Sequence, residues 1–154
     1  STLHTNDALS AFTRLIDMGI EPFLAAAPVK GVQAQRLVRR LCQKCSEAIS
    51  APELLSDQAI AQKRLALGSN WRRAVGCSDC QMTGFSGRTG IYELIEVSAG
   101  MQDLVAKGAS MNEMKAYSES GGFRTLFEDG LIKASHGKTT LEEIFRVVNS
   151  DMNN

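Results

Sequence analysis

Hydrophobic positions near the start of the chain recur at helical spacing and predict two short helices. The apolar stripe of the first helix consists of Leu9, Phe12, Leu15 and Ile16. Asn6 or Asp7 can cap that helix at its start, and Gly19 is suited to end it. Pro22 is expected to open the second helix, because proline is tolerated in the first turn. Pro28 should then end or kink it.

The next apolar run fits two kinds of element. Its members, Ala34, Leu37, Val38 and Leu41, match a helical stripe, but so short a run also fits a buried strand. Two later segments are clearer. Residues 71–75 are expected to form a short strand, and the alternation from Ile91 to Val97 predicts a longer one. Gly84, Gly87 and Gly90 are expected to mark tight turns before that strand.

Residues 98–154 are expected to form a helical subdomain of about four short helices, one of them around residues 99–107. Three Ser/Thr-x-x-Glu sequences match the capping box, in which two side chains satisfy orphan backbone donors at a helix start. These sequences are Ser110-x-x-Glu113, Thr125-x-x-Glu128 and Thr140-x-x-Glu143. Residues 52–67, upstream, are also expected to be largely helical.

Composition narrows the class of protein. The 154 residues suffice for one ordinary domain or two small ones, and the shares of hydrophobic and charged residues are those of a globular protein. Lys plus Arg equal Asp plus Glu at 17 each, which argues against a dedicated nucleic-acid binder. No apolar run approaches the ~18 residues of a membrane span. The start at Ser1 has no signal-peptide character and is expected to be a cut.

All four cysteines fall into two Cys-x-x-Cys pairs. They are Cys42, Cys45, Cys77 and Cys80. Two such pairs can present four thiolates to one tetrahedral zinc ion, and four thiolates leave no open position for water. The stretch of residues 46–76 is longer than the usual spacer, but loop-closure entropy grows only slowly with length. The pattern therefore predicts a structural zinc site.

Three other interpretations of the cysteines compete with zinc. Disulfides are disfavoured because no secretory signal is visible. A redox dithiol generally needs one Cys-x-x-Cys at a helix start, not two matched pairs. Four inert buried thiols are the third alternative.

Sequence words in a fixed order surround the cysteines. Before the first pair stand STLHTN (1–6), DMGIEPF (17–23) and AQRLVR (34–39). After the second pair stand TGFSGRTGIYEL (83–94), GL (130–131) and TLEE (140–143). With the cysteines, this order resembles the C-terminal part of the bacterial type II secretion and type IV pilus assembly ATPases. The resemblance covers essentially the whole chain.

The resemblance implies a mixed α/β fold in three parts. Residues 1–41 would be the end of a RecA-like ATPase core, and residues 42–90 a tetracysteine zinc subdomain with an inserted helix. Residues 91–154 would be a return strand and a C-terminal helical subdomain. In that family a homo-hexamer hydrolyses ATP with Mg²⁺ on the cytoplasmic face of the inner membrane. Platform and docking proteins of the secretion or pilus machine would be partners, with peripheral membrane association and no nucleic acid.

Three residues gain candidate roles from the resemblance. His4 lies in what resembles the family's His box, close to bound nucleotide. Arg36 either contacts the nucleotide region or belongs to a solvated basic run. Arg88, on a glycine-rich turn, suits a phosphate or a carboxylate of another subunit, and its side chain is expected to point outward.

Residues 137–139 (Gly-Lys-Thr) imitate the end of a phosphate-binding loop, but Ile132 stands where that motif requires glycine. The chain is therefore expected to be inactive towards ATP by itself. Two alternatives stay open at this point. The chain could be a nucleic-acid-binding zinc module, or a zinc-stabilised protein-interaction domain without an ATPase parent.

Overall fold

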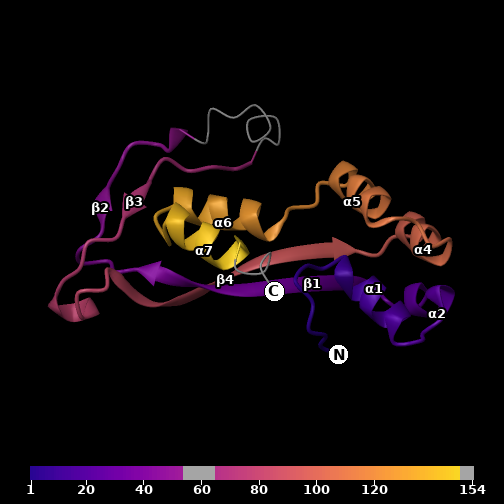
Figure 1. Ribbon diagram of the computed structural model, residues 1–154. Helices are drawn as coiled ribbons and strands as arrows, with labels where there is room; N and C mark the ends of the chain where they lie inside the picture. The colour runs from indigo at the N-terminus through magenta and orange to yellow at the C-terminus, as the bar shows by residue number, and fades with distance from the viewer. Residues whose placement is uncertain (54–64, 150–154) are drawn as a thin grey trace. The chain divides into compact units, whose positions relative to one another are not determined.

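The computed structural model describes residues 1–53 and 65–149 (Figure 1). The chain divides into two compact units that interleave in sequence. The first combines residues 1–35 with 92–126, and the second combines residues 36–91 with 127–154. Each unit is therefore built from segments far apart in the chain. The functional division expected from the resemblance, with boundaries after residues 41 and 90, stays a prediction.

The first unit contains four helices among its described elements. They are α1 (Ser10–Asp17), α2 (Pro22–Ala26), α4 (Ala99–Ala106) and α5 (Met111–Ser120). At the start of α1, Asp7 Oδ1 accepts the N–H of Ser10, the first residue of the helix, at 2.8 Å. The turn after α1 uses Gly19 at φ +87°, a conformation that glycine adopts without strain. Helix α2 opens on Pro22 and ends before Pro28, as predicted.

Two long strands, β1 (Gly31–Leu41) and β4 (Phe85–Glu96), pair with each other and run in opposite directions (Figure 1). The ambiguous run from Ala34 to Leu41 is thus a strand. Strand β4 confirms most of the predicted strand, but it begins well before Ile91 and ends at Glu96, one residue before Val97. The prediction of tight turns was wrong for Gly87 and Gly90, which lie inside β4, although Gly87 keeps a φ of +74°.

The second unit combines a small hairpin with two helices. Strands β2 (Glu47–Ala48) and β3 (Arg72–Arg73) pair antiparallel, and the short 3-10 helix η2 covers Ser78–Cys80. Helices α6 (Leu126–Ser135) and α7 (Leu141–Asn149) complete the described elements. The predicted strand at 71–75 is confirmed in shorter form. Of the helix predicted over 52–67, residues 54–64 lie outside the described residues, and residues 65–67 are not helical.

The core of the second unit forms around Trp71, which packs with Leu131 and Ala134 of α6. Its partly buried surroundings are Leu65, Leu67, Phe127 and Leu141. Helices α6 and α7 approach closely at Gly130, where an added Cβ would lie 2.8 Å from the side chain of Ile144. The rings of Phe127 and Phe145 add an aromatic contact with centroids 5.3 Å apart.

The four helices predicted within residues 98–154 are all present, as α4 to α7.

The capping boxes have different outcomes. The first forms in full, since the Ser110 hydroxyl accepts the Glu113 N–H and the Glu113 carboxylate accepts the Ser110 N–H. In the third, Thr140 Oγ1 accepts the Glu143 N–H at 3.1 Å, but the Glu143 carboxylate binds arginines instead of completing the box. The box at residues 125–128 stays a prediction.

Candidate metal centre

The four cysteine sulfurs lie together, all within 4.8 Å of one another. The Cys42–Cys77 pair is 3.9 Å apart, and the Cys45–Cys80 and Cys77–Cys80 pairs are each 3.8 Å apart. A tetrahedron with Zn–S bonds of about 2.3 Å has edges of about 3.8 Å. The site therefore has the size and the donor set for one tetrahedral, thiolate-bound ion.

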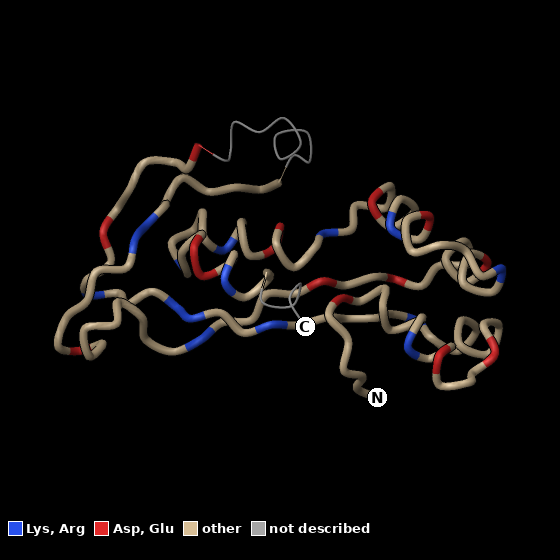
Figure 2. The backbone as a smooth tube through the Cα atoms, in the orientation of Figure 1, with Lys and Arg blue, Asp and Glu red and all other residues tan. Residues whose placement is uncertain are grey.

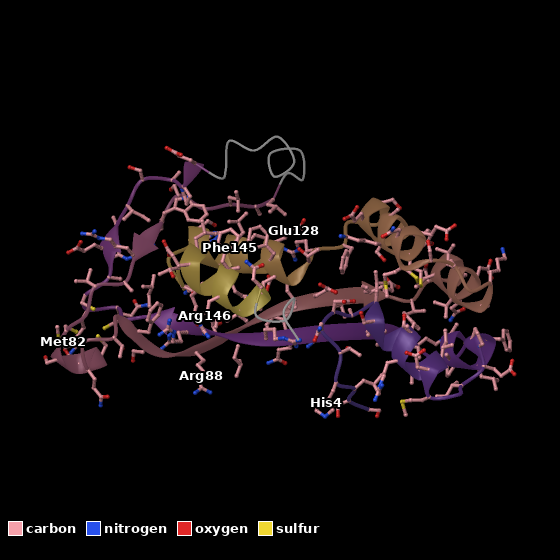
Figure 3. The ribbon with its side chains drawn as sticks, viewed as in Figure 1. His4, Met82, Arg88, Glu128, Phe145 and Arg146 are labelled. Carbon is pink, nitrogen blue, oxygen red and sulfur yellow. The ribbon has the colours of Figure 1, made fainter. Side chains whose placement is uncertain are left out.

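Backbone geometry holds the two cysteine pairs against each other. Cys42 directly follows β1, and its N–H donates to the carbonyl of Gly84, just before β4, at 2.9 Å. Directly after the second pair, the backbone turns through two left-handed residues, Gln81 (φ 52°) and Met82 (φ 61°). Met82 is 72% exposed at the tip of this turn (Figure 3). Gly76 is required beside it, because a Cβ there would lie 2.7 Å from the Met82 carbonyl oxygen.

Burial and hydrogen bonds to sulfur give the cysteine thiols different pKa values. Burial favours the neutral thiol of Cys80, but the N–H groups of Cys77 and Gly84, each 3.2 Å from its sulfur, outweigh burial and lower the pKa of Cys80 to about 6. Burial, reinforced by the three neighbouring cysteines, raises the pKa of Cys45 to about 12 despite the N–H of Gly76. A bound dication would reverse the penalty at Cys45, because metal binding displaces thiol protons.

The alternatives for the cysteines can now be compared with geometry. All four are free thiols, and separations of 3.8 Å are far from the ~2.05 Å of a disulfide. An exposed ion pair at 2.9 Å between Lys44 and Asp79 also joins the two pairs. The matched pairs form a single cluster of four donors, which favours a metal site over inert thiols.

The other candidate residues lie outside this centre. His4 is exposed at the edge of a hollow of about 330 Å³ that Asp7, Arg14 and Asp17 also line. It belongs to the first unit, whereas Arg36 and Arg88 belong to the second. Arg36 is half-buried on β1. Arg88 is exposed on β4, as expected, and its side chain points away from the strand pair (Figure 3). Their roles at a nucleotide stay predictions.

Sequence reasoning missed a buried carboxylate cluster in the second unit. The side chain of Glu143 has no exposed surface, and it binds Arg39 Nη2 at 2.8 Å and Arg146 Nη2 at 2.6 Å. It also accepts the backbone N–H of Arg39 at 2.9 Å. Burial alone would raise the pKa of Glu143, but the hydrogen bonds from Arg146 and Arg39 lower it to about 2. Of the two arginines, only Arg146 could have been predicted from the sequence as a partner, because it lies three residues after Glu143 on the same helix. Arg39 is far away in the chain.

The first unit also contains a buried carboxylate, that of Glu93. Its buried carboxylate accepts the N–H of Ala8 at 2.8 Å and that of Leu126 at 3.2 Å. Burial nevertheless raises the pKa of Glu93. The residue connects the N-terminal segment and the start of α6 to strand β4.

Comparison with known proteins agrees with the sequence words. Residues 1–146 match the family described as Type II/IV secretion system protein. The chain is 46% identical over 147 residues to Type II secretion system protein HxcR of Pseudomonas aeruginosa, covering 96% of this chain and 27% of that protein. It is 43% identical over 147 residues to Type II secretion system ATPase E of Vibrio cholerae, covering 96% and 29%. With Type IV pilus assembly ATPase PilB of Thermus thermophilus, identity is 42% over 145 residues, covering 94% and 16%.

The fold and the site define a mixed α/β protein with a cluster of four cysteines that could hold one metal ion. The matches show that the chain belongs to the Type II/IV secretion system protein family, as the resemblance implied. It spans less than a third of the length of these relatives. Within residues 1–53 and 65–149, no helix is long and apolar enough to cross a membrane.

Proposed function

We propose that this chain is the C-terminal part of an ATPase that drives type II protein secretion or type IV pilus assembly. The observation that carries the proposal is the identity of 42–43% to two proteins named as such ATPases, over nearly the whole chain. The parent would work as a homo-hexamer that hydrolyses ATP with Mg²⁺. Its first 41 residues here would complete a RecA-like core, with His4 and Arg36 near the nucleotide.

The metal centre has a structural role in this proposal, with zinc as the ion. Thiolates favour zinc among common cellular ions, and four protein ligands leave no position for a substrate. The site joins the end of β1 to the start of β4 through Cys42 and Cys80. A bound zinc would therefore fix the strand pair at this end, while the chemistry of ATP hydrolysis takes place elsewhere in the parent.

The parent would act on the cytoplasmic face of the inner membrane, associated peripherally through partner proteins. Those partners would be the platform and docking proteins of a secretion or pilus machine. The relatives are named for a type II secretion system and for type IV pilus assembly, which supports partners of this kind. No nucleic acid is needed, which agrees with the formal net charge of zero.

ATP hydrolysis by the full-length protein tests the proposal, with the present chain as comparison. The full-length protein should hydrolyse ATP in a magnesium-dependent manner. The chain alone should neither hydrolyse ATP nor gain thermal stability from it. A ligand stabilises a folded protein only if it binds to that folded state. A folded, assembled full-length protein without turnover would contradict the proposal. A magnesium-dependent thermal shift of the chain alone at millimolar ATP would show that the nucleotide site is misplaced.

Arg88 provides a second test in the full-length protein. If its guanidinium meets a phosphate or a carboxylate of another subunit, Arg88→Ala should reduce turnover at least about tenfold, equivalent to about 1.4 kcal/mol. Arg88→Lys should restore little, because an ammonium cannot replace a planar, bidentate group. Arg124, also exposed, offers the matched control, and Arg124→Ala should leave turnover unchanged. Wild-type turnover in assembled Arg88→Ala hexamers would make Arg88 an ordinary surface residue.

A further inference from the structure

A polar hollow of about 340 Å³ lies in the second unit, where the first cysteine pair meets the segment joining α6 to α7. The side chains that line it are Gln43, Ser46, Asn70, Arg72, His136 and Lys138. None of them is acidic and none is apolar. The lining therefore disfavours both a metal cation and a hydrophobic ligand.

Backbone contacts preform the walls of this hollow. The N–H of Asn70 donates to the carbonyl of Ser135 at 2.9 Å. Lys138 is fixed through both its backbone groups, to Lys133 and to Leu41, each at 3.0 Å. Gly137 has a φ of +72°, and a Cβ there would lie 2.7 Å from Asn70 Nδ2. The fold thus holds the lining residues close together, and only glycine can occupy position 137 between them.

The positive charges at the hollow are not neutralised within the described part of the chain. Arg72 donates from Nε to the Ser46 hydroxyl at 2.9 Å and from Nη2 to the Ser46 carbonyl, and neither acceptor is charged. These bonds use two of its five N–H groups. The ammonium of Lys138 has no hydrogen bond or ion pair with another described residue.

Other basic residues of the same unit do have acidic partners. Arg73 pairs with Glu47 at 2.6 Å across the hairpin, where Figure 2 shows the basic β3 beside the acidic start of β2. Lys44 pairs with Asp79, and Lys133 with Asp129. Even the arginine-lined hollow at Arg39 and Arg146 contains the Glu143 carboxylate. The hollow at Arg72 and Lys138 differs in having cations without an anion.

We infer that this hollow binds a phosphate group. Arg72 supplies a planar guanidinium and Lys138 a compact ammonium, the two side chains best suited to phosphate oxygens. The amides of Asn70 and Gln43 add neutral donors. The phosphate belongs either to a small soluble phosphoester or to the headgroup of an anionic phospholipid, and both present the same oxygens.

This site is not a phosphate-binding loop, although it contains the sequence Gly137-Lys138-Thr139. In such a loop, free backbone N–H groups surround the phosphate. Here the N–H of Gly137 is bonded to the carbonyl of Ala134, and that of Lys138 to the carbonyl of Lys133. Side chains must therefore supply the donors, and the inference does not depend on the proposed ATPase function.

Titration of the zinc-loaded 154-residue chain with inorganic phosphate tests the inference by amide NMR at constant ionic strength. Saturable shifts are expected at Asn70, Gly137 and Lys138, with a dissociation constant on the order of millimolar. Lys138→Gln should weaken binding about tenfold, since it removes a charge-assisted contact. Arg73→Gln is the matched control, because it removes the same charge from an arginine already paired with Glu47. It should change the dissociation constant less than about twofold.

The outcomes separate the inference from general electrostatics. Absence of saturable shifts, or equal weakening by Lys138→Gln and Arg73→Gln, would overturn it. Unchanged zinc content and amide dispersion in Lys138→Gln would show that the variant is folded. Arg72→Lys, which keeps the charge but loses the planar group, should also weaken binding.

Binding to lipid vesicles then distinguishes a phospholipid headgroup from a soluble phosphoester as the source of the phosphate. Co-sedimentation of the chain with phosphatidylglycerol vesicles, competed by inorganic phosphate and lost in Lys138→Gln, would assign a lipid headgroup. Phosphate binding without co-sedimentation would assign a soluble phosphoester. Vesicle binding that persists in Lys138→Gln without any saturable phosphate shift would overturn the site.

Discussion

Chelation of the metal is expected to unfold the region of the two cysteine pairs and the β2–β3 hairpin. Structural zinc contributes about 10 kcal/mol or more to the folding of small zinc domains. Two of the four sulfurs belong to buried residues, Cys42 and Cys80. Without the ion, the close thiols gain nothing that offsets the entropy of ordering both pairs.

Trp71 reports this transition directly. It is the single tryptophan of the chain, is 4% exposed, and its carbonyl accepts the N–H of Ile49, which follows β2. Chelation should shift its fluorescence to longer wavelength and abolish its near-UV dichroism, and zinc should restore both. Cys77→Ser should behave like the chelated protein, whereas the neighbouring, exposed Ser78→Ala should bind zinc normally. A metal-free protein with unchanged Trp71 signals would refute the structural role.

Loss of the Glu143 carboxylate is expected to have the second largest effect. Removing one member of a buried ionic cluster costs roughly 3–5 kcal/mol. Since Arg39 and Arg146 stay about half exposed, with side chains 47% and 58% accessible, we expect the lower end for Glu143→Gln, about 3 kcal/mol. Urea unfolding of the zinc-loaded chain measures the difference. Glu142→Gln is the matched control, because Glu142 is adjacent but exposed, and should change the free energy of unfolding little.

The same carboxylate predicts a pH dependence. Its pKa is lowered from 4.5 in the unfolded chain to about 2 in the folded one, so ionised Glu143 stabilises the fold. This stabilisation is fully present above about pH 5 and is lost as the pH falls from about 5 towards 2. The stability gap between wild type and Glu143→Gln should therefore narrow over that range. Metal loss at acid pH is expected to affect both proteins alike, because both keep the same four cysteines. A gap independent of pH would mean that the pKa of Glu143 is not lowered.

The sequence left β1 undecided for a geometric reason. Ala34 and Val38, both buried, are four residues apart, and this spacing places residues on one face of a helix and equally on one face of a strand. Leu41, also buried, fits the helical pattern better than the strict alternation of a strand. The segment forms a strand because it pairs with β4, which is far away in the chain. A local sequence pattern carries no information about such a distant partner.

Glycine is a misleading local signal in β4 for a related reason. Gly87 and Gly90 suggest turns by local preference, yet both lie in a strand that pairs with β1. Glu143 shows the same limit for side chains. Its capping motif predicts the bond from its N–H to Thr140, which is present, but its carboxylate binds Arg39 across 104 positions of sequence. The cysteine cluster was predictable because each pair is a local motif and four donors suit one ion.

X-ray absorption at the zinc edge, with metal analysis of the purified chain, tests the central claim most directly. One zinc per chain should be found, with four sulfur neighbours at about 2.3 Å and no nitrogen or oxygen. Replacing Cys45 by Ser should lower the sulfur count or abolish binding, since all four sulfurs form the cluster. A metal content far below one per chain after zinc loading, or a shell with nitrogen or oxygen ligands, would contradict a four-cysteine structural site.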